Sequence, residues 1–467
     1  MTSLPTWRAH PVRAELLRGS APWAGAAVLV VLAVPLVLTA DEWQGGWGQT
    51  QSLLRSLITQ LAAPVATAAG CWQGQREHRR GTRELLLSAA RTRLARTLTA
   101  ALPTAVWVSG ATLVASAGAL LACRPYASAG GPALSALWSD AGLVASLSLF
   151  GHVVGAVLRW RLTAPLLALC SPFAPLLPVL PLWPIPSSPL VPGMSGPMLH
   201  TSVPVWWEPV ATVGWLGGLA ATALLLYAAR RRVYALLPLT AALVAATVLV
   251  QGGDRAWRPN PLVSRTACDT SVRPEICVSG LHPGMLPEVR RALSGLTSRL
   301  EGVENAPTRL SDAHHLMMRS HALLGREDEV PEPDPYEAAT PTIVLFGQGV
   351  IRSRLVDPER FAWDTARSIT GDTVSCEARR KHPEVHRIDR AVTEFLAPNP
   401  AGDGAENWSG SWSPSAGYGE PADRDALVAA LDRLRAMGGE ERRRWLSAYF
   451  ATSRVCEDGV PARVPAL

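Results

Sequence analysis

Long apolar stretches alternate with short arginine-rich segments over the first half of the chain. A helix needs about 20 predominantly apolar residues to cross the hydrocarbon core of a bilayer, which is roughly 30 Å thick. By this criterion the pattern predicts seven membrane spans, and hence an all-α polytopic membrane domain. The predicted spans are Ala21–Ala40, Gln51–Gly74, Thr97–Cys123, Leu134–Leu158, Thr163–Trp183, Trp207–Ala229 and Val233–Gln251.

Charged residues within the predicted spans include Arg55 and Asp140. Arg55 lies near one end of the second span, where a long side chain can reach the interface by snorkelling at modest cost. Asp140 lies near the outer end of the fourth span. The sequence therefore gives no sign of a buried charge pair or an ion-binding cluster of the kind that marks a secondary-transport pathway.

The distribution of arginine predicts the orientation of the spans. Basic loops precede the first span and follow the second, fourth and sixth, whereas the alternate loops contain only Arg124. The positive-inside rule places the basic loops in the cytoplasm. We therefore expect a multi-pass plasma-membrane protein in which residues 1–20 are a cytoplasmic N-terminus and, after seven crossings, residues 252–467 form an extracytoplasmic domain.

A cleavable signal peptide is the alternative for the first span, because Leu38-Thr39-Ala40 has the small residues of a cleavage site. The apolar region is about 20 residues long, whereas signal peptides have 7 to 15 apolar residues. An uncleaved first span is the favoured interpretation.

Charge is divided unevenly between the two halves. Residues 1–252 carry 17 arginines and 7 acidic residues, while residues 253–467 carry 27 basic and 31 acidic residues, so the net charge of +6 combines +10 and −4. Because the basic excess belongs to predicted cytoplasmic loops, it does not indicate nucleic acid as a partner.

The C-terminal half has the composition of a soluble domain, and at about 200 residues it is large enough to own a core. Apolar residues at helical spacing predict helices, and one apolar run predicts a buried strand at Thr342–Phe346. A helix-rich α+β domain is therefore expected. The predicted helices are Met285–Val303, Pro358–Thr370, Pro383–Leu396, Pro421–Met437 and Gly439–Arg454.

Four cysteines follow the last predicted span, where an oxidising compartment would allow disulfides. Four cysteines permit three pairings. The favoured pairs are Cys268 with Cys277, which flank a turn-like segment, and Cys376 with Cys456. Free thiols in a reduced domain are the alternative.

The sequence lacks the motifs of zinc metalloproteases, of serine hydrolases with a nucleophile elbow and of P-loop ATPases. It contains neither H-E-x-x-H nor G-x-S-x-G. The histidines His314, His315 and His321 are not accompanied by a carboxylate at a metal-ligand spacing, so core or solvated histidines are a better interpretation than a zinc site. The P-loop pattern G-x-x-x-x-G-K-[ST] is also missing, and Lys381 is the only lysine. We therefore expect a chain that is not an enzyme and holds no metal or cofactor.

The loop after the second span carries the most specific pattern. Residues 75–96 include seven arginines, and the segment Glu77–Arg93 reads EHRRGTRELLLSAARTR. Gly81-Thr82 is a plausible helix start, with Glu84 in the first turn, where the helix dipole favours an anion. The leucines that follow form an apolar patch suited to a partner protein, although an interfacial helix whose arginines only set topology is the plainer alternative.

This segment resembles the cytoplasmic loop of permease subunits of ABC transporters of the type-2 exporter class. In that family an acidic and basic pair precedes Gly-Thr, Glu-Leu-Leu and further arginines. The resemblance is close over about 17 residues, and the spacing of the first six spans is also similar. The matching residues are Glu77, Arg80, Gly81, Thr82, Glu84, Leu85, Leu86 and Arg91.

The resemblance implies that these residues form a coupling helix that docks on a separate P-loop ATPase, which holds the ATP and Mg²⁺. It also implies a six-helix permease domain at residues 21–232, working as a homodimer or with a similar permease. The predicted seventh span, residues 233–251, and the domain after it depart from the minimal permease of this class. The substrate is left open.

A different class of function is a membrane-anchored binding protein, sensor or degenerate peptidase-like protein in which residues 252–467 act and the spans only anchor. One span is enough to anchor a soluble domain, so seven spans with a patterned loop favour the permease. Contact between the loop and an ATPase would discriminate the two.

Overall fold

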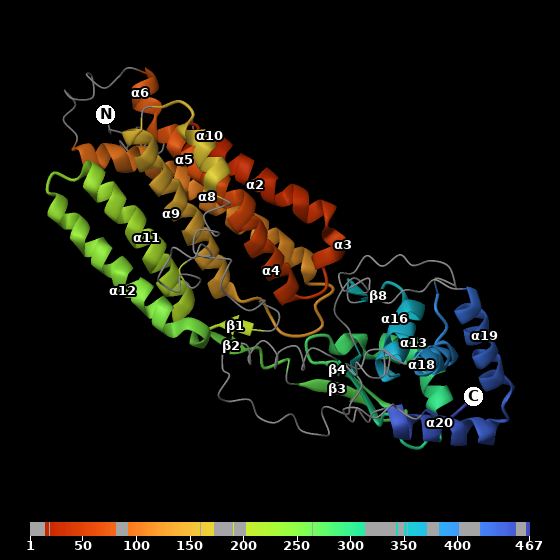
Figure 1. Ribbon diagram of the computed structural model, residues 1–467. Helices are drawn as coiled ribbons and strands as arrows, with labels where there is room; N and C mark the ends of the chain where they lie inside the picture. Colours follow the sequence, from red (N-terminus) through yellow and green to blue (C-terminus); the bar gives the residue numbers. More distant parts are fainter. Residues whose placement is uncertain are drawn as a thin grey trace, which may run out of the picture. The chain divides into compact units, whose positions relative to one another are not determined.

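The computed structural model contains two compact units, Met1–Asn260 and Pro261–Leu467 (Figure 1). The described residues are 15–17, 19–80, 92–158, 160–171, 190, 202–263, 265–312, 342–343, 350–352, 354–370, 383–400, 421–453 and 464–467. Most of them are helical.

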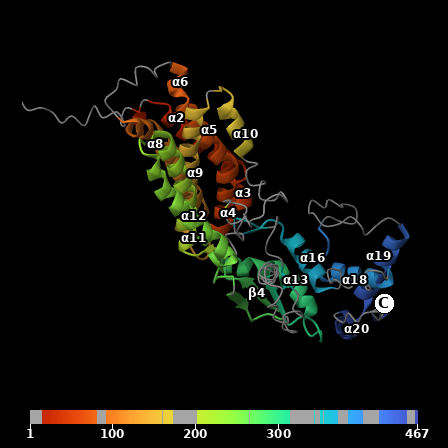
Figure 2. The same cartoon turned by 60° about the vertical axis from the view of Figure 1, so that its left-hand side comes forward.

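The N-terminal unit is a helical bundle. Its elements are α2 (Ala21–Leu38), α3 (Ala40–Trp43), α4 (Trp47–Leu57), η2 (Ile58–Ala62), α5 (Ala63–Gly74), α6 (Arg76–Arg80), α8 (Arg93–Cys123), α9 (Leu134–Val157), α10 (Thr163–Cys170), α11 (Trp207–Ala228), η5 (Arg232–Ala235), α12 (Leu236–Gly252) and η6 (Gly253–Ala256). Two short strands, β1 (Ser202–Pro204) and β2 (Trp257–Pro259), pair antiparallel. Helices α11 and α12 lie side by side in both views (Figures 1 and 2).

Five helices among the described residues are long and apolar enough to cross a membrane. They are Glu15–Leu38, Arg93–Cys123, Leu134–Val157, Trp207–Ala228 and Arg232–Gly252. Large apolar side chains on their outward faces are exposed, among them Leu38, Val114, Leu121, Leu237 and Val244. Helices that are apolar on their outward faces as well as in their contacts are typical of an integral membrane protein.

The second and fifth predicted spans stay predictions. The second falls within a helical run from Trp47 to Gly74 that is divided by the π-helical turn η2. Pro64 follows this turn, and because proline has no N–H it cannot continue the regular i to i−4 ladder, which explains a local π turn. The fifth begins as α10, and its continuation toward Trp183 lies outside the described residues.

The C-terminal unit combines a small sheet with helices. Strands β3 (Thr266–Asp269), β4 (Glu275–Ser279), β5 (Arg309–Asp312) and β6 (Thr342–Ile343) lie in that order, and β7 (Val350–Ile351) pairs with β8 (Arg354–Leu355). β3 runs antiparallel to β4, whereas β4, β5 and β6 are parallel to one another. The remaining elements are η7 (Pro283–Met285), α13 (Leu286–Leu300), α16 (Pro358–Ile369), α18 (Pro383–Leu396), α19 (Pro421–Ala436) and α20 (Gly439–Ser453).

The core of this unit forms where the apolar face of α13 meets the sheet and the later helices. Val289, Leu293, Leu296 and Leu300 are buried on one face of α13, as the sequence pattern predicts. All five predicted helices of this half are present, and their ends differ from the predicted ones by no more than a few residues. The amphipathic period was therefore a sufficient signal for them.

Candidate functional site

The predicted coupling loop is described at its two ends. α6 follows α5 after a single residue, and α8 begins after Thr92, whose Oγ1 accepts a hydrogen bond from the N–H of Ala95 at 3.3 Å. Gly81, Thr82, Glu84, Leu85, Leu86 and Arg91, together with the side chains of Glu77 and Arg80, lie outside the described residues. Their role in coupling stays a prediction.

Polar contacts tie the beginning of this loop to neighbouring helices. The guanidinium of Arg76 lies 2.6 Å from the carboxylate of Glu15, which precedes α2. The side-chain amide of Gln75 donates to the carbonyl oxygen of Trp160, after α9, at 2.8 Å. His78 Nε2 lies 3.1 Å from the carbonyl oxygen of Ala156, so the ring donates a proton there in the tautomer that carries it on Nε2. The segment that leads into the loop therefore contacts the chain just before α2 and the chain at the C-terminal end of α9.

The end of the loop is attached to a different helix. The guanidinium of Arg93 lies over the ring of Tyr227 in α11, 4.3 Å from the ring centroid. A cation in this position is attracted by the negative face of the ring. The two ends of the loop are thus held to different helices of the bundle.

A glycine seam joins α5 to α9. It consists of Gly70 and Gly74 on α5 and Gly151 and Gly155 on α9. A Cβ atom at any of the four would overlap a backbone carbonyl oxygen of the other helix: Ser148, His152, Thr67 and Cys71 respectively. Gly70 meets Ser148 and Gly74 meets His152, so residue numbers rise in the same direction along the two helices, which therefore run parallel.

The signal for this seam is two Gly-x-x-x-Gly motifs, one in each of the predicted second and fourth spans. Small residues at this spacing let the backbones of two membrane helices approach closely, so that packing and not a hydrophobic driving force holds them. The seam lies at the end of α5 that leads into α6 and the loop.

Arg55 does not snorkel to an interface, so that expectation is wrong. Its residue is only 8% exposed, and its guanidinium faces two carboxylates: Nη2 is 3.7 Å from Glu208 Oε1, and Nε is 4.0 Å from Asp140 Oδ1. These three residues, the charge cluster, come from α4, α9 and α11. The expectation that the spans lack a buried charge pair is therefore also wrong.

The surroundings of the charge cluster are polar on one side and aromatic on the other. The Thr212 hydroxyl donates to Glu208 Oε1 at 3.2 Å, and the Arg55 guanidinium lies 5.7 Å from the ring centroid of Trp257. Arg55 Nη1 is buried and has no hydrogen-bond partner among the described residues. Charged residues inside a membrane bundle are costly and are commonly functional.

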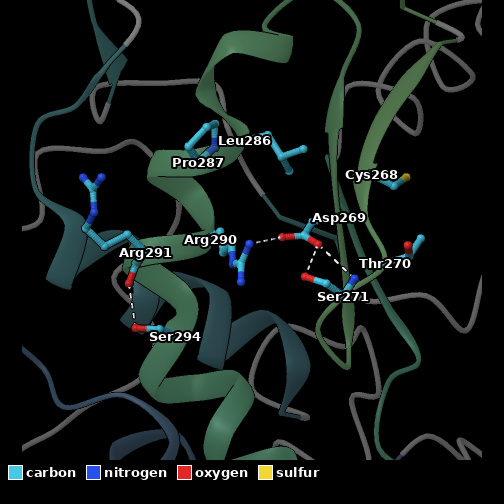
Figure 3. Close-up of a pocket in the computed structure, with 9 residues that line it drawn as sticks. All are labelled: Cys268, Asp269, Thr270, Ser271, Leu286, Pro287, Arg290, Arg291 and Ser294. Carbon is cyan, nitrogen blue, oxygen red and sulfur yellow. Dashed lines mark hydrogen bonds and ion pairs between the residues drawn. The ribbon is translucent and has the colours of Figure 1, made fainter.

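A shallow pocket of about 740 Å³ lies in the C-terminal unit beside β3 and the start of α13 (Figure 3). Asp269 lies at its centre: it accepts hydrogen bonds from the hydroxyl and N–H of Ser271 at 2.6 and 2.9 Å, and its other oxygen is 3.0 Å from Arg290 Nη1. The hydrogen bonds from Ser271, reinforced by Arg290, hold the pKa of Asp269 below its ordinary value. Since Asp269 and Arg290 pair with each other, the pocket offers no excess charge from these two groups.

The predicted disulfide between Cys268 and Cys277 is confirmed. The two residues face each other on β3 and β4, with Cα atoms 4.1 Å apart. Cys376 and Cys456 lie outside the described residues, as do His314, His315 and His321, so the second pairing stays a prediction.

We compared the chain with known protein families, with curated proteins and with solved structures, and none of the three comparisons finds a match.

Proposed function

We propose that the chain is the transmembrane permease subunit of an ATP-driven ABC exporter in the plasma membrane. A separate P-loop ATPase hydrolyses ATP, and the loop of residues 75–96 receives its movement. The observation that carries the proposal is the attachment of this patterned loop to α5, which packs backbone to backbone on α9 through the glycine seam. The permease works as a homodimer or with a similar permease.

The geometry suits transmission of force. No side chain separates α5 from α9 at the glycine seam. Because close-packed interiors have low compressibility, a displacement of α5 would act directly on α9. The contacts of Arg76 with Glu15 and of Arg93 with Tyr227 extend that connection to the helices beside them. A movement of the loop would therefore act on several helices at once.

In this proposal the C-terminal unit is extracytoplasmic. The Cys268–Cys277 disulfide favours this side, because disulfides persist in oxidising compartments and are rare in the cytosol. The proposal counts seven spans: the five long apolar helices and the second and fifth spans that the sequence predicts. Because seven is an odd number, it assigns the residues before the first span and the C-terminal unit to opposite sides of the membrane.

The test is to purify the tagged full-length protein from its native membrane in mild detergent and to identify by mass spectrometry what accompanies it. A stoichiometric P-loop ATPase is expected. Glu84→Arg should remove it, because the substitution reverses the charge at the proposed docking surface. Glu301→Arg is the matched control: it reverses the charge of an exposed residue at the C-terminal end of α13, where the helix dipole tolerates a cation.

Retention of the ATPase by the Glu84→Arg protein would contradict the coupling role of the loop. Purification without any ATPase would contradict the permease proposal as a whole. In that event the membrane-anchored binding protein, with the C-terminal unit as its active part, becomes the better account.

A further inference from the structure

The charge cluster contains more buried acidic groups than buried basic groups. It contains one guanidinium and two carboxylates, and Arg55, Asp140 and Glu208 are 8%, 5% and 6% exposed. If both acids were ionised, the cluster would hold one net negative charge within the bundle. An uncompensated buried charge is costly, and a titratable group commonly responds by taking up a proton.

Arg55 does not neutralise both carboxylates. Its two ion-pair separations, 3.7 and 4.0 Å, are longer than the 2.7 to 2.9 Å of a charge-assisted hydrogen bond. Its Nη1 group is buried without a hydrogen-bond partner among the described residues. The guanidinium is therefore shared between the two acids and fully paired with neither.

No other cation of the described part of the unit compensates the second acid. The charged groups that act on Asp140 are Arg55 from α4 and Glu208 from α11. Arg255 on η6 and Arg258 on β2 are exposed. The additional group on Glu208 is the neutral hydroxyl of Thr212.

We propose that Asp140 and Glu208 share one exchangeable proton beside Arg55, so that the charge cluster is a buried proton-binding site. The proton comes from solvent and forms an O–H bond on one carboxyl group, which leaves one carboxylate, one neutral acid and one guanidinium. The site is then electrically neutral. A negative charge on one carboxylate repels a second negative charge beside it, so one proton on either acid relieves the excess. This proposal does not depend on the permease function.

Infrared spectroscopy of the purified full-length protein in detergent tests the proposal. A protonated carboxyl group has a C=O stretching band that ionised carboxylates lack. An ordinary glutamate side chain has a pKa of about 4.3, so ordinary carboxyl groups are ionised when the pH is well above this value. We expect the wild-type protein to retain one such band above that pH, to shift it in D₂O and to lose it as the pH is raised further.

Two single variants assign the band. Asp140→Asn and Glu208→Gln each leave one acid for one guanidinium, so the remaining acid should be ionised and the band should be lost. Glu359→Gln, a substitution of an exposed acid at the first turn of α16, should leave it unchanged. If the neutral variants fail to fold, Glu208→Asp keeps both acids and should keep the band at a shifted frequency.

If the wild-type protein shows no protonated carboxyl band when the pH is well above about 4.3, the proposal is overturned, whatever the variants show. A band that survives both Asp140→Asn and Glu208→Gln belongs to another group, and this result also overturns the proposal. The same conclusion follows if Asp140→Asn leaves the band in place and Glu208→Asp leaves its frequency unshifted.

Discussion

The carbonyl oxygen of Ser148 in α9 occupies the space that a Cβ atom on Gly70 in α5 would need. Gly70→Ala should therefore force α5 away from α9, because a backbone carbonyl cannot move aside as a flexible side chain can. Overpacking of this kind costs about 1–3 kcal/mol. We expect a lower midpoint of thermal unfolding for the variant in detergent.

The matched controls for this prediction are Gly110→Ala and Gly118→Ala in α8. A Cβ atom at either position meets nothing within 4 Å. Both should unfold at or slightly above the wild-type temperature, since alanine favours a helix by up to about 1 kcal/mol over glycine. An equal loss of stability in the controls and in Gly70→Ala would show that the glycine seam is not the cause.

Arg55→Gln should destabilise the N-terminal unit in a pH-dependent manner. Removing one partner of a buried ion pair costs about 3–5 kcal/mol, because it leaves an uncompensated charge. Here two acids would remain, and both can be neutralised by protons at low pH. The loss of stability, measured by thermal unfolding across pH, should be smaller in acid and larger as the pH rises.

Arg124→Gln is the control for Arg55, since Arg124 is an exposed arginine at the end of α8. It should leave the unfolding temperature within error of the wild type at every pH. If Arg55→Gln behaved like Arg124→Gln, the burial of the charge cluster would not matter for stability.

The two units show what a sequence can and cannot predict. The helices of the C-terminal unit were predictable because period and apolar face are local properties, and the α18 prediction, Pro383–Leu396, agrees at both ends. Cys268 and Cys277 were predictable for the same reason, because a short turn brings them together.

The surroundings of Arg55 were not predictable in this way. Its partners stand in α9 and α11, far along the chain, and nothing local distinguishes an arginine that snorkels from one that turns inward to meet two acids. The short strand β4 and the π turn η2 were also missed, since a strand of five residues and a shift of the helical ladder both depend on their packing. The Gly-x-x-x-Gly motifs, by contrast, are visible in the sequence and predict the α5 contact with α9 once they are paired.

The disulfide offers a further prediction. A cross-link between residues nine apart restricts the unfolded chain, and the loop-entropy relation gives about 2.5 kcal/mol for a loop of this length. The double variant Cys268→Ser, Cys277→Ser should therefore show faster hydrogen exchange in β3 and β4, measured by mass spectrometry on the full-length protein. Cys170→Ser removes an exposed free thiol and should not change exchange there; unchanged exchange in the double variant would argue against stabilisation by the cross-link.

Acid should weaken the C-terminal unit in part through Asp269. The hydrogen bonds from Ser271 lower its pKa in the folded state, whereas the unfolded value is about 3.9. A lowered pKa contributes stability that is fully present above the unfolded value and is lost as the pH falls through the folded pKa. Ser271→Ala removes the hydroxyl donor. Hydrogen exchange near β3, corrected for intrinsic rates, should therefore depend less on pH below about 4 in this variant than in the wild-type protein. Ser294→Ala is the control, because the Ser294 hydroxyl donates to the carbonyl oxygen of Arg291 and not to a carboxylate (Figure 3); the same change in both variants would contradict the assignment to Asp269.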